Sequence, residues 1–305
     1  KYNLGNFEFS QNYFMFFDKL EKSNYFLENI LKTLDESYDS RLMMHLLHSP
    51  VQDGGQWDMF VNLIEKYGVV PQSVMAESFQ SSQSRMMNQF LTRKLREFAW
   101  TLREMNGKGK KLSELRKEKE KMMSVIYSML CVCLGDPPTK FDWQTRDKKN
   151  KFIRLTDLTP VDFYKKHSNV NLKDKVCLIH APMSNKKMNE LYTVSYLGNV
   201  VGGEIIKYAN VEINDIKRAA IKSIKSNESV WFGCDVGKMF HRQLGLMHMD
   251  LYDYEALFGT KFKMNKATRL EYGDSQMTHA MLFTGVDLVG GKSRRWRVEN
   301  SWGIK

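Results

Sequence analysis

The chain has 305 residues and carries 46 Lys and Arg against 35 Asp and Glu, which gives a formal net charge of +11. With 42% hydrophobic and 27% charged residues, its composition is typical of a globular protein that has enough apolar side chains for one large domain or two ordinary ones. The apolar runs are far too short to span a bilayer, and the first residues lack the apolar stretch of a signal peptide.

The first part of the chain is predicted to be helical. Apolar residues recur near helical spacing over residues 7–34, and Ser10 is the expected N-cap of this helix. A glycine-bearing loop follows at residues 50–57. A second helix is expected over residues 58–67, with Gly68 as its stop.

Residues 84–135 form a compositional block of their own. Their helical apolar pattern breaks at residues 107–109, resumes in a charged stretch from residue 112, and ends at the Gly-Asp-Pro-Pro of residues 135–138. Two helices of this kind, placed between the start and the end of the main fold, are expected to be an accessory or assembly element. The alternating charges of residues 117–121 predict a solvated helix face.

After residue 138 the pattern changes to strands, interrupted by one helix at about residues 213–226. Strands are predicted at residues 141–143, 176–179, 191–196, 230–236, 279–286 and 296–300. Helices first and strands later indicate an α+β fold, because a regular alternation of strands and helices would be needed for a parallel sheet.

The four cysteines make a poor disulfide framework, since Cys131 and Cys133 are separated by a single residue. We interpret all four as reduced thiols in the role of small core residues, which favours a cytosolic location. Their spacing does not match a zinc site, and the pair His45 and His48 lacks a third ligand. No dinucleotide, phosphate-loop or metalloprotease motif is visible, so no cofactor is implied.

A histidine near the C-terminus carries the most specific chemical signal. His279 begins an apolar strand, and Asn300 follows 21 residues later, where the next strand ends in Asn-Ser-Trp-Gly. If the two strands pair antiparallel, the Asn300 amide oxygen can accept a hydrogen bond from one ring nitrogen, which fixes the tautomer and leaves the other nitrogen to face a nucleophile. Trp302 is expected to cover the pair and exclude competing water. A lone strand histidine is more often structural than catalytic, but the asparagine motif reverses that preference.

A thiolate nucleophile needs an adjacent imidazole as its base, and the base is best held by a third group such as an amide. His279 and Asn300 can supply the base and its orienter. None of the four cysteines sits in a sequence context that predicts the nucleophile, so the chain is expected to carry one half of a catalytic set.

Several motifs resemble the papain-like cysteine proteases, and one narrows the resemblance to the bleomycin hydrolase branch. His279-Ala280 followed by the Asn-Ser-Trp-Gly motif is similar to the His and Asn motifs of the family. The branch is indicated by Asp53-Gly54-Gly55-Gln56-Trp57-Asp58-Met59. Further similar stretches are residues 7–11, 131–135, 191–194, 201–203 and 230–237. The resemblance covers essentially the whole chain and implies a papain-like α+β fold, with a helical left domain, an antiparallel β right domain and a helical insertion.

The same resemblance divides the chain into three expected parts. Residues 1–83 are the helical part of the papain-like domain, and residues 84–138 are the helical insertion. Residues 139–305 are the mainly β part that carries His279 and Asn300. In the family such an insertion helps to build a hexameric ring, so a homo-oligomer is expected.

The resemblance also implies a cysteine aminopeptidase without a cofactor. His279 is the expected general base, Asn300 its orienter and Trp302 a support of the active site. Gly54 and Gly55 are expected to line the substrate cleft, where the lack of a Cβ lets a peptide backbone bind at close range. A plain tight turn is the alternative interpretation of these two glycines.

Two parts of the family's enzyme are expected outside the chain. The nucleophilic Cys and the oxyanion-hole Gln are expected upstream of residue 1, and the tail that restricts the family to N-terminal residues is expected beyond residue 305. The sequence by itself is therefore expected to be inactive. The resemblance implies peptides, related amides and thiolactones as substrates, since the family inactivates a glycopeptide drug and hydrolyses homocysteine thiolactone.

Two alternatives remain open from the sequence. One is a non-catalytic papain-like scaffold in which the nucleophile is truly absent. The other is weak nucleic-acid binding through the basic surface as a secondary activity, although no nucleic-acid-binding module is visible. A cytoplasmic peptidase is the leading hypothesis.

Overall fold

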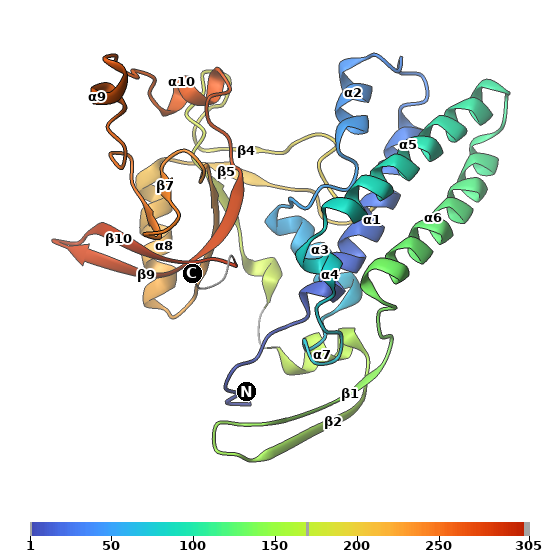
Figure 1. The fold of residues 1–305 in the computed structure, drawn as a ribbon, viewed down its shortest axis with the longest axis horizontal. Coiled ribbons are helices and arrows are strands. Elements are labelled where there is room, and N and C mark those ends of the chain that lie inside the picture. Colours follow the sequence, from blue (N-terminus) through green and yellow to red (C-terminus); the bar gives the residue numbers. More distant parts are fainter. Residues whose placement is uncertain (1, 169–170, 302–305) are drawn as a thin grey trace. The chain divides into compact units, whose positions relative to one another are not determined.

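A computed structural model describes residues 2–168 and 171–301 of the chain (Figure 1). These residues divide into two compact units, which are described one at a time below. Unit 1 comprises Lys1–Lys175 and Thr193–Ile206, and unit 2 comprises Val176–Tyr192 and Lys207–Lys305. Among the described residues, no helix has the length and apolar character that crossing a membrane requires.

Unit 1 is built around helix α1 (Gln11–Lys32), whose start was predicted. The Ser10 hydroxyl accepts a hydrogen bond from the Tyr13 backbone N–H at 3.0 Å and so satisfies one of the unpaired donors of the first turn. Helix α3 (Trp57–Tyr67) ends at Gly68, as the sequence predicts. Gly68 has a φ of +71°, and a Cβ there would lie 2.2 Å from the Pro160 backbone, so both conformation and packing require glycine.

The predicted pair of helices in the block from residue 84 is confirmed. These are α5 (Arg85–Gly107) and α6 (Leu112–Leu134), and both pack against α1 (Figure 1). Short helices α2 (Arg41–His48) and α4 (Phe79–Ser82) complete the helical part. The core between them is a single cluster of buried apolar side chains, which includes Phe16, Phe26, Leu27, Ile30, Leu91, Leu95, Leu102, Leu115, Ile126 and Leu130.

The prediction that residues 117–121 of α6 form a solvated helix face is wrong for Lys119, which is buried. The Lys119 side chain is 8% exposed, and its ammonium donates to Glu28 Oε1 and Asn24 Oδ1, both at 2.8 Å. The flanking Lys117 and Lys121 are exposed, as expected. Lys119 lies on the face that packs against α1, so a partner on another helix, which the local pattern cannot reveal, determines its burial.

The rest of unit 1 forms a second apolar cluster against α3. Strands β1 (Phe141–Arg146) and β2 (Phe152–Leu158) form an antiparallel hairpin, and α7 (Pro160–His167) packs on α3. A single 3₁₀ turn, η1, follows at Leu172–Asp174. The sequence interpretation had found β1 but neither β2 nor α7.

Unit 2 contains a three-stranded antiparallel sheet with the strand order β10-β9-β6. Helix α8 (Ile213–Lys225) packs against β6 and β9. The strands are β6 (Val230–Cys234), β9 (His279–Val289) and β10 (Lys292–Glu299). All three were predicted, with β9 and β10 longer than expected because residues 290–291 make only a tight glycine turn between them.

A second sheet of unit 2 is mixed, because β5 pairs parallel with β3 and antiparallel with β4. Its strands are β3 (Cys177–Ile179), β4 (Glu190–Tyr192) and β5 (Tyr208–Asn210). The remaining elements are β7 (Phe240–His241), β8 (Leu246–Met247), α9 (Tyr254–Phe258) and α10 (Lys266–Glu271). Helices dominate unit 1 and sheets dominate unit 2, so the fold class is α+β, as predicted.

Candidate active site

The predicted pair of His279 and Asn300 comes together at one end of the β9–β10 hairpin. His279 is the first residue of β9, and Asn300 follows the last residue of β10. The His279 Nε2 and Asn300 Oδ1 atoms are 2.9 Å apart, which is hydrogen-bond distance. The register brings them there, since Leu282 pairs with Glu299, and an irregularity between Arg297 and Val298 redirects the end of β10.

A second hydrogen bond identifies which atom of the Asn300 amide, the oxygen or the nitrogen, faces the imidazole ring. The Ser301 backbone N–H donates to Asn300 Oδ1 at 2.8 Å, so this atom must be the amide oxygen and an acceptor. The ring nitrogen that faces it, Nε2, is therefore the donor and carries the proton. In the neutral ring Nδ1 is then the basic nitrogen, as a general base requires.

The backbone just before His279 is fixed to β6 and to the residues that follow it. The Thr278 backbone N–H donates to the Cys234 carbonyl at 3.0 Å, and the Thr278 hydroxyl accepts from the Val236 N–H at 3.2 Å. Met277 packs on Gly233, where a Cβ would lie 2.1 Å from the Met277 sulfur. These contacts hold the start of β9, so that the His279 ring is carried on a rigid strand rather than on a loop.

Cys234 lies directly opposite His279 in the β6–β9 register, a neighbourhood that the sequence interpretation did not foresee. Side chains of directly paired residues lie on the same face of a sheet. However, burial, and then the adjacent Asp235 carboxylate, raise the pKa of the Cys234 thiol. A nucleophilic cysteine needs the opposite shift, because the thiolate is the reactive form. We therefore interpret Cys234 as a packing residue beside the ring.

Replacing Cys234 with serine tests this interpretation. We expect kcat/KM of the full-length protein on a peptide substrate to stay within about threefold of the unaltered value, whereas loss of a nucleophile costs about 10⁴-fold or more. The measurement is steady-state kinetics, with thermal unfolding as a check of folding. A variant without turnover that still unfolds at the original temperature would make Cys234 the nucleophile and overturn the interpretation.

The other three cysteines lie elsewhere in the fold. Cys131 and Cys133 are on α6, where burial raises the pKa of both thiols, and Cys177 begins β3. None of the four cysteines forms a disulfide within the described residues. Over residues 2–168 and 171–301, no group of three His, Cys, Asp or Glu side chains has the arrangement of a metal site. Trp302, which was expected to cover the His279–Asn300 pair, lies outside the described residues.

Gly54 and Gly55 form an exposed stretch in unit 1 just before α3. Neither glycine has a positive φ, and a Cβ on either one would meet no atom within 4 Å. The fold therefore requires glycine at neither position. The N–H and C=O of Gly55 make no hydrogen bond within the described part of the chain, so both remain open to a ligand.

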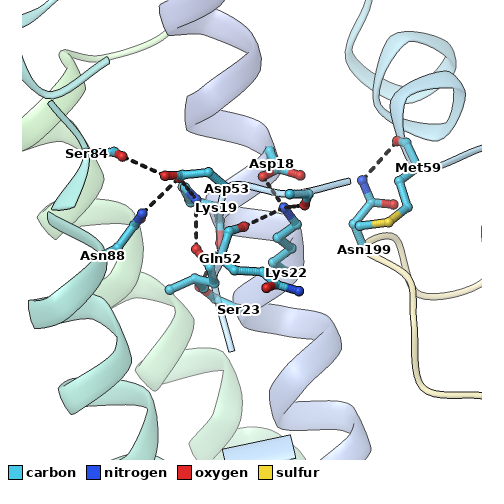
Figure 2. A network of polar contacts seen from close by, with 12 residues as sticks. Asp18, Lys19, Lys22, Ser23, Gln52, Asp53, Met59, Ser84, Asn88 and Asn199 are labelled. Carbon is cyan, nitrogen blue, oxygen red and sulfur yellow. Dashed lines mark hydrogen bonds and ion pairs between the residues drawn. The ribbon is translucent and has the colours of Figure 1, made fainter. Parts of the chain in front are cut away.

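The loop that carries these glycines is anchored to its surroundings in unit 1 (Figure 2). Lys19 and Lys22 of α1 bond to residues 51–54, and the buried Asn199 side chain donates to the Met59 carbonyl at 2.9 Å, in the first turn of α3. The sequence interpretation missed all three side chains. Lys19 and Lys22 share a helical stripe with Phe16 and Phe26. The sequence does not show the loop carbonyl groups that pair with them, so this stripe alone does not predict their burial.

The α+β fold, with a histidine bonded to an asparagine across two strand ends, is that of the papain-like cysteine peptidases. Comparison with known proteins agrees, since the Peptidase C1-like family matches residues 1–305. The chain belongs to this family of cysteine peptidases.

Curated relatives and a solved structure support the assignment over nearly the whole chain. Aminopeptidase C of Listeria monocytogenes is 49% identical over 99% of this chain and 68% of its own length. Human bleomycin hydrolase is 46% identical over 99% of this chain and 68% of its own length. A crystal structure of PepW from Lactobacillus rhamnosis matches with a TM-score of 0.97 and 50% identity, over 99% of this chain and 68% of the other. The resemblance to the bleomycin hydrolase branch is thereby confirmed.

Proposed function

We propose that this chain carries the base and part of the substrate site of a cysteine aminopeptidase of the bleomycin hydrolase type, active in the cytoplasm. The observation that carries the proposal is the 2.9 Å contact between His279 Nε2 and Asn300 Oδ1, together with the Ser301 N–H bond that orients the amide. This arrangement gives the imidazole one defined tautomer, with Nδ1 as its basic nitrogen. Four cysteines without a disulfide in the described part of the chain are compatible with a reducing compartment.

In the proposed reaction, His279 takes the proton of a cysteine thiol that none of the four cysteines of this chain supplies. The thiolate sulfur attacks the carbonyl carbon of the N-terminal peptide bond, and the C–N bond breaks as His279 gives its proton to the leaving amine. Water then loses a proton to His279 and attacks the thioester, which releases the amino acid and restores the thiol. Asn300 holds the ring throughout and stabilises the imidazolium.

Gly54 and Gly55 are proposed to bind the backbone of an extended peptide. An extended ligand binds a protein through alternating main-chain donors and acceptors, and the exposed N–H and C=O of Gly55 offer one of each. The open space beside both Cα atoms admits such a ligand at a distance that a side chain would prevent. In this proposal, substrate binding requires glycine at these two positions, and the conformation of the loop does not.

Gly55→Ala should separate binding from stability. We expect KM for a peptide substrate to rise about two- to tenfold, the equivalent of one main-chain hydrogen bond. Thermal stability should stay equal or rise slightly, because Gly55 does not have a positive φ and a Cβ there meets no atom within 4 Å. Gly5→Ala is the matched control, since Gly5 is also exposed and open. A fall in stability with unchanged KM would instead assign Gly55 to a structural turn.

Peptides with a free N-terminus are the proposed substrates, as the names of the relatives suggest, and related amides and thiolactones follow from the same acyl chemistry. The division into residues 1–83, 84–138 and 139–305, the hexameric ring and a supporting role for Trp302 stay predictions from the family resemblance. Weak nucleic-acid binding by the basic surface also stays a prediction, and its affinity should fall steeply with salt.

The test is an assay of the full-length protein, expressed from its native reading frame, on a fluorogenic aminoacyl amide and a short peptide. Release of N-terminal residues that is blocked by a thiol-alkylating reagent supports the proposal. A full-length protein that folds but releases no amino acid, and that carries no further cysteine for His279 to activate, would be the non-catalytic scaffold.

A further inference from the structure

Two lysines of α1 lie beneath the Gly54–Gly55 segment and take no part in the mechanism described above. Lys19 and Lys22 are one helical turn apart, and their side chains are only 1% and 5% exposed. Burying an ammonium costs free energy unless its donors are satisfied, so two of them side by side call for an explanation. Figure 2 shows that both point at the loop that carries Gln52 and Asp53.

The three donors of the Lys22 ammonium are all used. Its Nζ donates to Asp18 Oδ2 at 2.6 Å, to the Gln52 carbonyl at 2.8 Å and to the Gly54 carbonyl at 2.7 Å. Asp18 lies one turn earlier on the same helix and balances the charge. Lys22 therefore ties two carbonyl groups of the loop to a rigid helix through charge-assisted bonds, which are the stronger kind.

Lys19 holds the other half of the loop. Its Nζ donates to the Val51 carbonyl at 2.7 Å and to Asp53 Oδ1 at 2.5 Å. Asp53 also accepts from Asn88 at 2.8 Å and from Ser84 at 2.7 Å, both near the start of α5. Burial alone would raise the pKa of Asp53, but the charge of Lys19 and these hydrogen bonds outweigh it and lower the pKa to about 2. The loop is thus fixed on both sides of Gln52 by charged groups.

The bond to the Gly54 carbonyl has a direct consequence for Gly55. The Gly54 C=O and the Gly55 N–H belong to one planar trans peptide unit and point in opposite directions. When Lys22 holds the carbonyl toward α1, the Gly55 N–H must face away from α1, on the open side of the loop. Between two glycines no Cβ restrains this peptide plane, so the ammonium supplies the restraint that the side chains lack.

We propose that Lys22, supported by Lys19, is a positioning residue for substrate binding, because it locks the Gly54–Gly55 peptide plane with its N–H turned toward the substrate. The proposal rests on the substrate role assigned to Gly54 and Gly55 above. Lys22 does not touch the substrate in this account. It acts through Gly54, and it also polarises the amide so that the Gly55 N–H is a better donor.

The experiment compares Lys22→Met, Lys22→Arg and Lys32→Met in the full-length protein. Lys22→Met keeps most of the side-chain volume but removes every donor, and we expect KM for a peptide substrate to rise about tenfold. Lys22→Arg keeps the charge and the donors, so it should recover most of the affinity. Lys32→Met removes a charge from an exposed position of the same helix and should behave as the unaltered protein does.

A second readout separates positioning from general damage. The rate at which iodoacetamide alkylates the active-site thiol depends on the thiol and its base but not on the loop, so it should stay unchanged in Lys22→Met. If Lys22→Met folds poorly, Asp18→Asn/Lys22→Met removes both charges together and should show the same rise in KM. A normal KM in a folded Lys22→Met or Asp18→Asn/Lys22→Met variant overturns the proposal. So does a fall in the alkylation rate of the active-site thiol as large as the rise in KM. A full-length protein without any turnover would instead overturn the proposed function, and this proposal with it.

Discussion

His279→Ala should abolish turnover, with a fall in kcat/KM of about 10⁴-fold or more in the full-length enzyme. The histidine is proposed to act in both halves of the reaction, first as the base that forms the thiolate and then as the acid that protonates the leaving amine. Without His279 the nucleophile stays a neutral thiol, which attacks poorly, and the leaving amine has no proton donor. The effect should fall on kcat, because no substrate-binding contact is lost.

The matched control is His45→Ala. His45 is an exposed histidine on α2 of unit 1, so the same chemical change is made at a position without a proposed role. Steady-state kinetics on a peptide substrate and thermal unfolding are measured for both variants. His279→Ala should unfold close to the original temperature, since His279 is only partly buried. Turnover within about tenfold of the unaltered enzyme would remove His279 from the mechanism.

The His279–Asn300 pair could be predicted from the sequence because every part of its signal is local. The strand of His279 and the strand before Asn300 are separated by a glycine turn, so the chain itself dictates antiparallel pairing. The helix signals at Ser10 and Gly68 were local in the same sense, since a hydroxyl cap and a positive φ are properties of single residues.

The buried lysines could not be predicted in this way. Lys19, Lys22 and Lys119 look like ordinary solvated charges, and lysine is almost never fully buried unless it is paired. Asp18 is a local partner of Lys22, but the loop carbonyl groups and Glu28 lie roughly 30 to 90 residues from these lysines in the chain, so only the tertiary fold brings them together. The neighbourhood of Cys234 and His279 was missed for the same reason, since 45 residues separate the two sides of that strand pair.

Asn300→Ala should lower kcat/KM by about 10- to 150-fold, less than the loss of His279, because it removes the group that holds the base but not the base itself. This range corresponds to the 1.5–3 kcal/mol of a hydrogen bond to a charged group, here the imidazolium that forms during the reaction. The ring should remain near its position, since the start of β9 stays bonded to β6 through Thr278. Steady-state kinetics on the same peptide substrate measures the loss.

A double-mutant cycle decides whether Asn300 acts through His279. If it does, Asn300→Ala should cost almost nothing further in the His279→Ala background, so that the two losses are strongly non-additive. If Asn300 instead served only the stability of the hairpin, its removal would lower the unfolding temperature and would affect both backgrounds alike. Additive losses would therefore contradict the role of orienter, even if the single variant were as slow as expected. The cycle tests the 2.9 Å contact as a functional bond and not merely as a close approach.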